Sequence, residues 1–363
     1  MKQTAIPYMQ LRGGSSKGLY FHADDLPSDP DVREAVLVAA MGGADARQVD
    51  GLGGADPLTS KVAVVSLSER PDADLDYLFA QVVVGKGRVD TTQNCGNILA
   101  GVAPFALETG LLRAASDETR VRIYMVNSGN LCEVTVQTPD GRVEYQGAAR
   151  IDGAPGTAAP VICDYLDVAG SACGALLPTG RLRDRFEGVE VTCIDNGMPV
   201  VVLRAADLEI SGYESAAELN ANEALKQRLE AIRLQAGPAM NLGDVSAKVV
   251  PKMSLVAPPR AGGSLCTRKF IPHVCHAAIG VLGAVSVATA AILPGSVAAD
   301  VAEVPGGTSK QMSVEHPCGE FSVELEVKGS AGAPEIQRAG LLRTARALSR
   351  GELYVPGHLW PRD

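Results

Sequence analysis

The alternation of apolar and polar residues predicts β-strands in both halves of the chain. Short runs rich in Val, Ile and Leu, bounded by Gly, Pro, Asn and Asp, are typical of strands. Two of these runs are joined by Pro139-Asp140-Gly141, which is a hairpin signal. The predicted strands are residues 61–68, 75–84, 121–126, 131–138, 142–147, about 189–204, about 247–257 and 321–329.

Two further segments have the apolar spacing and the end signals of amphipathic helices. The first follows Ser28-Asp29-Pro30 and ends at Gly42, with proline in its first turn and glycine at its end. The second runs from Ser215 to Gln235 and opens with Ser215 and Glu218, the pair of a capping box. We expect each helix to cover a core with one apolar face.

Two other helical segments are too apolar for a surface. Residues 96–110 are hydrophobic on most sides, and residues 276–293 contain no Asp, Glu, Lys or Arg. The second approaches the ~20 residues of a membrane span, but its Ala, Gly, Ser and Thr are weakly hydrophobic for lipid. A helix that is apolar all round is usually buried in protein. The pattern therefore predicts an α+β protein with two pseudo-equivalent domains, in each of which sheet surrounds a central helix.

Length, composition and charge narrow the class of protein. A chain of 363 residues is natural for two domains of roughly 100–200 residues each. The apolar share of 46% against 4% aromatics means that Ala, Val, Leu and Ile build the core, and such a chain is not disordered. With 33 basic and 42 acidic residues the net charge is −9, and no run of five basic residues is present. A nucleic-acid partner is therefore not expected.

The eight cysteines do not form a recognisable metal or disulfide motif. None has CxxC spacing, and the first residues lack a signal-peptide pattern, so we expect reduced thiols in a cytoplasmic protein. His273, Cys275 and His276 are too closely spaced for a tetrahedral site and have no evident fourth ligand. We expect no metal there, and we expect His276 to form hydrogen bonds at the start of the second buried helix.

The strongest candidate for chemistry is Asn94-Cys95-Gly96-Asn97, at the start of the first buried helix. Unpaired N–H groups at a helix N-terminus stabilise a thiolate, which would make Cys95 reactive. Gly96 permits close approach of a ligand, and Asn94 could cap the helix. Position alone leaves the alternative open that Cys95 is simply a small buried residue.

Lys61 is the second candidate, because a lysine that leads into an apolar strand is unusual. If it is buried, the neutral amine is favoured and can act as a base; a surface lysine at a strand end is the alternative. The segment Arg12–Gly18 has the hydroxyls and glycines to hold an anion, although it does not match a phosphate loop. Between a strand and a helix, the sequence contains neither the GxSxG elbow of a hydrolase nor a GxGxxG motif.

Several ordered motifs together resemble the PrpF family, a branch of the diaminopimelate epimerase superfamily. They are RGGSSKG, DGLGGADPLTSK, QNCGN, IDNGMP and the final RTARALSRGELYVP, so the resemblance runs nearly end to end. It implies a diaminopimelate epimerase-like α+β fold with two pseudosymmetric domains, each with a central helix in mostly antiparallel sheet. The implied domains are residues 1–183, completed by 345–363, and residues 184–344, with the active site where the N-termini of both central helices point.

One departure from the superfamily changes the expected chemistry. Epimerases of the superfamily carry one cysteine on each central helix, and Cys95 matches the first of them. The second helix reads Val281-Leu282-Gly283-Ala284, without a cysteine. A racemisation with two thiols is therefore not expected. The resemblance instead implies that Lys61 and Cys95 form the acid–base pair of an isomerase, without assigning which of them is the base.

The resemblance also implies an activity and a set of partners. We expect a cofactor-independent proton shift that converts the keto form of 4-oxalomesaconate to its enol; allylic or cis–trans isomerisation of a related unsaturated tricarboxylate is the alternative. The expected partner is a small polycarboxylate, with no nucleic acid, membrane, metal or cofactor, and a homodimer stays open. A binding protein without activity and a thiol redox protein are the other classes considered. The residues implied in substrate binding are Arg12, Ser15, Ser16, Asn94, Gly96, Asn97, Ser128, Arg268, His276 and Gly283.

Overall fold

The computed structural model describes residues 3–92, 94–166, 169–276, 278–330 and 333–361, which divide into two compact units. Unit 1 comprises the chain up to Leu166 and again from Leu342, and unit 2 comprises the residues between. The chain thus passes from unit 1 to unit 2 after Leu166 and returns to unit 1 at Leu342. Both positions come earlier in the sequence than the domain boundaries expected at 183/184 and 344/345. The reason at the first is that Gly170 and Leu176 exchange main-chain hydrogen bonds with Asp195 of unit 2, at 2.7 and 2.9 Å.

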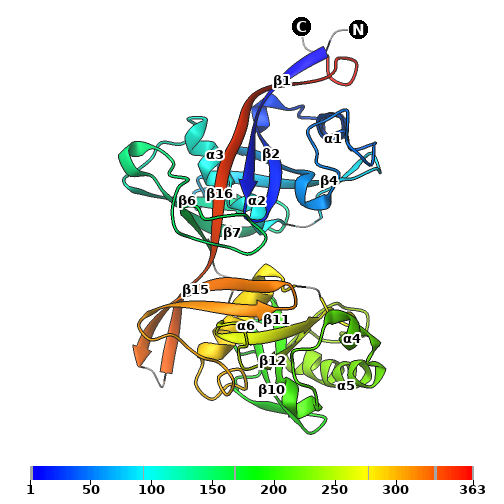
Figure 1. The fold of residues 1–363 in the computed structure, drawn as a ribbon, viewed down its shortest axis with the longest axis vertical. Coiled ribbons are helices and arrows are strands. Elements are labelled where there is room, and N and C mark those ends of the chain that lie inside the picture. The colour runs from blue at the N-terminus through cyan, green and yellow to red at the C-terminus, as the bar shows by residue number, and fades with distance from the viewer. Residues whose placement is uncertain (1–2, 93, 167–168, 277, 331–332, 362–363) are drawn as a thin grey trace. The chain divides into compact units, whose positions relative to one another are not determined.

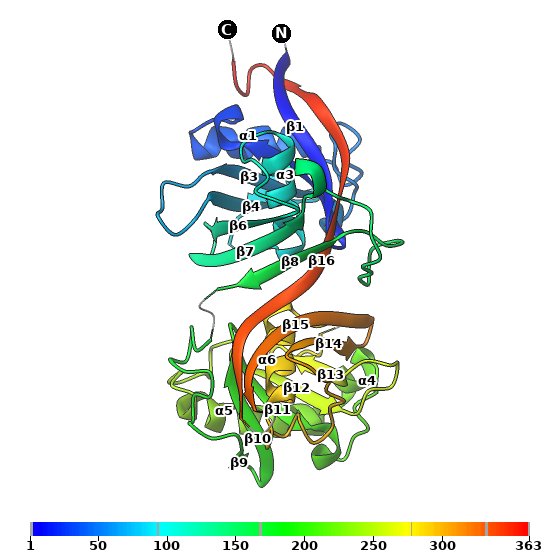
Figure 2. The same cartoon turned by 90° about the vertical axis from the view of Figure 1, so that its left-hand side faces the viewer.

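In unit 1, a mostly antiparallel sheet surrounds two short helices. Among the strand pairs whose register is described, β2–β3 and β4–β6 are the parallel ones in this unit. Both β1 and β8 neighbour β16, so the strands enclose α2 and α3, which pack against β1, β2, β3 and β7 (Figure 2). The strands are β1 (Gln3–Gly13), β2 (Ser16–His22), β3 (Lys61–Leu67), β4 (Leu75–Val83), β5 (Arg88–Asp90), β6 (Glu118–Met125), β7 (Asn130–Gln137), β8 (Pro160–Tyr165) and the later part of β16 (Ala333–Pro356). The helices are α1 (Pro30–Met41), α2 (Gly96–Leu99) and α3 (Val102–Glu108), with 3₁₀ turns η1 (Ala23–Asp25), η2 (Pro57–Thr59) and η3 (Pro139–Gly141).

Unit 2 repeats this plan with one long buried helix. Helix α6 (Val281–Ile292) buries ten of its residues and packs against β10, β11, β14 and β15 (Figure 1). Two amphipathic helices, α4 (Ala216–Ala221) and α5 (Glu223–Ala239), contribute leucines to a hydrophobic core cluster of this unit. The strands are β9 (Asp184–Phe186), β10 (Val189–Asp195), β11 (Pro199–Arg204), β12 (Lys252–Ala257), β13 (Leu265–Phe270), β14 (Ser309–His316), β15 (Gly319–Ser330) and the first part of β16, with 3₁₀ turn η4 (Ala205–Leu208).

The predicted α+β class is confirmed, and so are the local end signals of the helices. Asp29 caps α1 by accepting hydrogen bonds from the N–H groups of Asp31 and Val32, both at 3.0 Å, and Gly42 ends it at φ 65°. The capping box of Ser215 and Glu218 is present at the start of α4. Within the described ranges, no helix is long and apolar enough to cross a membrane.

Three helix predictions differ from the structure in their bounds. The segment after Cys95 forms two helices, because the Tyr20 hydroxyl donates to the carbonyl of Ile98 at 2.7 Å and the chain tightens at Gly101. The helix expected over 215–235 breaks at Asn222, whose side chain caps α5 instead. The second buried helix begins at Val281 rather than near His276.

The strand predicted over 142–147 is wrong. Instead of the second strand of a hairpin, these residues make single main-chain bonds, such as Glu144 N–H to the carbonyl of Gln137 at 2.9 Å. The turn before them is a 3₁₀ turn with Asp140 at φ 55°. The second partner of β7 is β8, which follows about twenty residues later.

The capping box allows a direct test of local stability. Replacing Ser215 by Ala is expected to lower the free energy of unfolding by about 1 kcal/mol, because the N–H of Glu218 loses its acceptor. Urea denaturation of the variant measures this loss. The same replacement at Ser211 leaves the α4 cap intact, so a loss of equal size in both variants would contradict this account.

Candidate active site

The hairpin of β1 and β2 packs directly against the start of α2. A Cβ atom on Gly14, which has φ 52°, would lie 2.1 Å from Asn97 Oδ1, and one on Gly13 would lie 2.2 Å from the Asn97 carbonyl oxygen. Asn97 Nδ2 in turn donates to Ser15 Oγ at 3.1 Å and to Ser16 Oγ at 3.4 Å. The glycines of the RGGSSKG motif are therefore needed for this close approach, which places both serines beside α2.

Arg12 holds the same turn from the other side. Its Nη1 donates to the Gly14 carbonyl at 2.7 Å and to Thr344 Oγ1 at 2.9 Å. Burial, together with the positive charge of Arg346, lowers the pKa of Arg12. Arg12 thus fixes the shape of the serine-bearing turn, and its expected role in substrate binding stays a prediction.

Cys95 is the N-cap residue of α2 and is half-buried. Its carbonyl accepts hydrogen bonds from the Leu99 N–H at 3.0 Å and the Tyr77 hydroxyl at 3.3 Å, whereas its thiol makes no capping bond. The side chain expected to cap the helix, Asn94, instead donates from Nδ2 to Ser128 Oγ. Asn94 Oδ1 is buried and has no hydrogen-bond partner among the described residues. The segment therefore presents a half-buried thiol and an unused buried acceptor.

Ser128 reaches Asn94 because Asn127 anchors its loop. Asn127 Oδ1 accepts from the Phe79 N–H, and its Nδ2 donates to the carbonyls of Phe79 and Thr91, all at 2.8 Å. The loop between β6 and β7 is thereby tied to β4 and to the residues that precede Cys95. Asn127 is a supporting residue that the sequence analysis treated only as part of a turn.

Lys61 is the first residue of β3 and is buried, with 9% of its surface exposed. Its Nζ donates to Gln81 Oε1 at 2.7 Å and lies 5.2 Å from the centre of the Phe79 ring. Gln81 is directly opposite Lys61 in the β3–β4 ladder, and its amide is oriented by hydrogen bonds to the carbonyls of Pro57 and Ser60. Among the described residues Lys61 has no acidic partner. The burial of Lys61 excludes the alternative that it is a surface lysine at a strand end.

Three of the residues predicted to bind substrate lie in unit 2, and their surroundings differ from one another. Arg268 is buried, but its Nε donates to the Glu214 carbonyl at 2.6 Å. His276 is exposed and lies ahead of α6, with Nδ1 accepting from the Ala278 N–H at 2.9 Å. Gly283 is buried in the first turn of α6. The expectation that His276 stands at the start of this helix is wrong, because its N–H bonds back to the Lys269 carbonyl and keeps the chain extended.

Lys269 follows Arg268 directly on β13. Successive side chains of a strand point to opposite faces, so Lys269 points away from the side of β13 where Arg268 meets Glu214. A Cβ atom on Gly283 would lie only 1.9 Å from Lys269 Nζ. Burial, followed by the charge of Lys252, lowers the pKa of Lys269 to about 8. No signal in the sequence distinguishes the two faces of β13.

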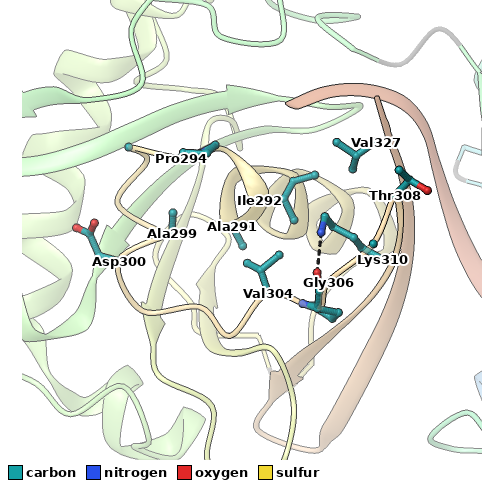
Figure 3. A pocket seen from close by; sticks show the side chains of 13 residues that line it. Ala291, Ile292, Pro294, Ala299, Asp300, Val304, Gly306, Thr308, Lys310 and Val327 are labelled. Carbon is teal, nitrogen blue, oxygen red and sulfur yellow. Dashed lines mark hydrogen bonds between the residues drawn. The ribbon is translucent and has the colours of Figure 1, made fainter. Parts of the chain in front are cut away.

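A cavity of about 650 Å³ in unit 2 lies apart from these residues. It is at the C-terminal end of α6, where Ala291, Ile292 and Lys310 line it (Figure 3). Lys310 Nζ donates to the Pro305 carbonyl at 2.6 Å, and Asp300 is ion-paired with arginines. None of the predicted site residues lines this cavity. Within the described part of the chain, no group of three or more His, Cys, Asp or Glu side chains could hold a metal.

Comparison with known proteins identifies what the chain is similar to. It is 58% identical over 360 residues to 4-oxalomesaconate tautomerase of Pseudomonas putida (99% of each chain). It is 59% identical over 351 residues to (4E)-oxalomesaconate Delta-isomerase of Novosphingobium sp. strain KA1, covering 97% of this chain and 98% of that one. The crystal structure of a methylitaconate-delta-isomerase aligns with a TM-score of 0.85 at 33% identity, covering 99% and 97% of the two chains.

These relatives confirm the class of enzyme expected from the sequence, an isomerase. The family model described as PrpF protein matches residues 3–356. The end-to-end order of motifs and the close approach of the RGGSSKG turn to the QNCGN segment agree with that match. The chain belongs to the PrpF family.

Proposed function

We propose that this isomerase converts the keto form of 4-oxalomesaconate to its enol by general acid–base catalysis, with Lys61 and Cys95 as the acid–base pair. The observation that carries the proposal is the position of Lys61, a buried amine that Gln81 orients and no described carboxylate neutralises. Cys95 lies in the same unit as a half-buried thiol. The tautomerase at 58% identity supports the choice of substrate.

The chemistry of the substrate explains why two such groups suffice. In 4-oxalomesaconate a methylene stands between a ketone and a carbon–carbon double bond, so loss of one methylene proton gives a dienolate. A base takes this proton, and an acid returns a proton to the ketone oxygen to form the enol. General acid–base catalysis of this kind contributes about 10²–10⁴-fold. Hydrogen-bond donors that face the developing oxygen charge contribute further.

We assign the proton-abstracting role to Lys61 and the proton-donating role to Cys95. An amine is a stronger base than a thiolate, and a thiol is a stronger acid than an ammonium group. For Lys61 to act as the base its amine must be neutral, and no described carboxylate forms an ion pair with it. The proton that Lys61 takes from carbon and the proton that Cys95 gives to oxygen balance, and solvent resets the pair.

The donor groups around α2 are suited to the carboxylates of the substrate. Ser15, Ser16, Asn97 and Ser128 supply neutral donors, and α2 begins beside them at Gly96. Neutral donors bind an anion without a large local positive charge. This is consistent with a chain of net charge −9 that takes a tricarboxylate.

Similarity to one relative supports a second candidate reaction of the same dienolate, an allylic shift of the double bond. The Delta-isomerase at 59% identity is as similar to this chain as the tautomerase is. Returning the proton to the far carbon of the original double bond, rather than to oxygen, would move that double bond into conjugation with the ketone. The two reactions share the base and the intermediate and differ only in where the acid stands.

Proton magnetic resonance in D₂O separates these outcomes. Keto 4-oxalomesaconate treated with the enzyme is expected to lose its methylene signal and to gain a second vinylic signal, the mark of the enol diene. A monodeuterated saturated carbon beside a carboxylate would instead identify the allylic shift. A substrate that neither changes nor exchanges its methylene protons would refute the proposed function.

A further inference from the structure

The segment that leads into Lys61 is held together by one buried glutamine. Gln48 lies in the loop after α1 and is 2% exposed. Its Oε1 accepts hydrogen bonds from the Ala55 N–H and from the Ser60 hydroxyl, both at 2.7 Å. Ala55 and Ser60 stand on either side of the 3₁₀ turn η2, and Ser60 directly precedes Lys61. One amide oxygen therefore fixes both ends of the turn that leads into β3.

The Gln48 side chain is held at a cost to the surrounding chain. A Cβ atom on Gly53 would lie 2.3 Å from both Cδ and Oε1 of Gln48, so glycine is needed there. Gln48 and Ala55 have φ angles of 50° and 58°, a region that L side chains rarely adopt. Gln48 Nε2 is buried and has no hydrogen-bond partner among the described residues. Strain of this kind persists where the rest of the structure imposes it, and it is concentrated at functional sites.

The turn that Gln48 fixes supplies the carbonyls that orient the Gln81 amide. Gln81 Nε2 donates to the carbonyl oxygens of Pro57 at 3.1 Å and Ser60 at 2.9 Å. Because its NH₂ group is engaged there, Gln81 presents Oε1 to Lys61, whose Nζ donates to it at 2.7 Å. The opposite orientation of the amide would set oxygen against two carbonyl oxygens and one donor against another. The position of the turn therefore decides whether Lys61 has an acceptor.

We propose that Gln48 is a positioning residue for Lys61, which it reaches through Ser60 and Gln81. Gln48 holds Ser60, and the Ser60 carbonyl orients Gln81. The Gln81 amide then holds Lys61 Nζ without the charge of an ion pair. A misplacement of about 1 Å that begins far from the chemistry can lower a rate by about 10²-fold. The inference rests on the proposed function, in which Lys61 takes the methylene proton.

Gln48→Met tests this role, because Met has a similar length and no amide oxygen. We expect kcat for 4-oxalomesaconate to fall about tenfold or more while KM changes little, since the base is displaced and the substrate-binding groups are not. Thr119→Val is the matched control, because it removes a buried hydrogen bond to Thr138 elsewhere in unit 1. It should lose stability and keep kcat. Wild-type kcat in folded Gln48→Met, beside an inactive Lys61→Met, would overturn the proposal.

A double-mutant cycle tests the route through Gln81. Gln81→Met alone should lower kcat at least as much as Gln48→Met does. Adding Gln48→Met to Gln81→Met should then cost little more, because the route to Lys61 is already broken. Losses of kcat that multiply in the double variant would show that Gln48 acts by another route and would contradict the proposal.

The reactivity of the Lys61 amine supplies a readout without turnover. Acetic anhydride should acetylate this buried amine slowly relative to exposed Lys86, and Gln48→Met should raise that relative rate several-fold, as measured by mass spectrometry of peptides. An unchanged relative rate would contradict the positioning of the amine by Gln48. If Lys61→Met keeps its turnover, the proposed acid–base pair is refuted, and the acetylation rate then decides by itself whether Gln48 positions the amine.

A second variant covers the case that Gln48→Met does not fold. Ser60→Ala removes the same hydrogen bond from its donor side and leaves Gln48 bonded to the Ala55 N–H. The lost hydroxyl also lies 2.9 Å from the Asp56 carbonyl oxygen. This smaller change is expected to lower kcat about tenfold and to raise the relative acetylation rate of Lys61. Wild-type values of both in Ser60→Ala would overturn the proposal.

Discussion

Lys61→Met is expected to lower kcat/KM for 4-oxalomesaconate by about 10³-fold or more, because general acid–base catalysis contributes up to about 10⁴-fold and Lys61 is the base of the proposed mechanism. Met fills a similar volume and leaves the buried surface covered. The side chain of Gln81 keeps its bonds to the carbonyls of Pro57 and Ser60, so the strands are expected to stay in register. The loss should therefore appear in kcat, while KM changes little.

Exchange of the substrate methylene with D₂O identifies what the variant has lost. If Lys61 is the base, exchange falls together with turnover, because the dienolate no longer forms. Lys86→Met is the matched control, since Lys86 is exposed in the turn between β4 and β5 and should keep wild-type rates. Turnover within tenfold of wild type in folded Lys61→Met would remove Lys61 from the mechanism.

The parts of the fold that could be predicted are those that neighbouring residues determine. The helix from Pro30 to Met41 carries its own cap at Asp29 and its own end at Gly42, and the structure keeps both. The run Lys61–Leu67 is apolar enough to be a buried strand in any arrangement. Such elements need no knowledge of distant partners.

The wrong predictions concern segments whose structure depends on hydrogen bonds to residues that are distant in the sequence. Residues 142–147 have a strand pattern, but β7 already pairs with β6 and then with β8, so no ladder is left for them. The stretch after Phe270 is apolar enough for a helix, yet Cys275 bridges back to Phe270 and delays the helix to Val281. Tertiary hydrogen bonds outweighed local propensity in both cases.

The candidate site likewise contains some residues that the local sequence identifies and others that only distant contacts identify. Lys61 and Cys95 could be singled out because a lysine before an apolar strand and a cysteine before an apolar helix are chemically unusual in themselves. Gln81 could not, because its place opposite Lys61 depends on the register across the 68–74 loop. Arg268 and Lys269 are neighbours in one strand, and only the packing of α4 and α6 decides which of them faces which helix.

Cys95→Ser is the second replacement with a large expected effect, a fall in kcat of about 10²-fold. A serine hydroxyl is a much weaker acid than a thiol, so return of the proton to the dienolate becomes slow. The replacement is small and Cys95 is only half-buried, so the fold should be unaffected. Cys318→Ser, at an exposed cysteine of unit 2, is the matched control and should keep full activity.

The diagnostic measurement is again methylene exchange, now with the opposite expected result. Because Lys61 is intact in Cys95→Ser, the dienolate still forms and returns to substrate, so exchange should continue while product formation falls. Loss of exchange in Cys95→Ser with exchange retained in Lys61→Met would reverse the two roles. Unchanged turnover in Cys95→Ser would leave the lysine as the one essential group, and the half-buried thiol at the N-cap of α2 would then be a packing residue, the alternative that its sequence position alone had left open.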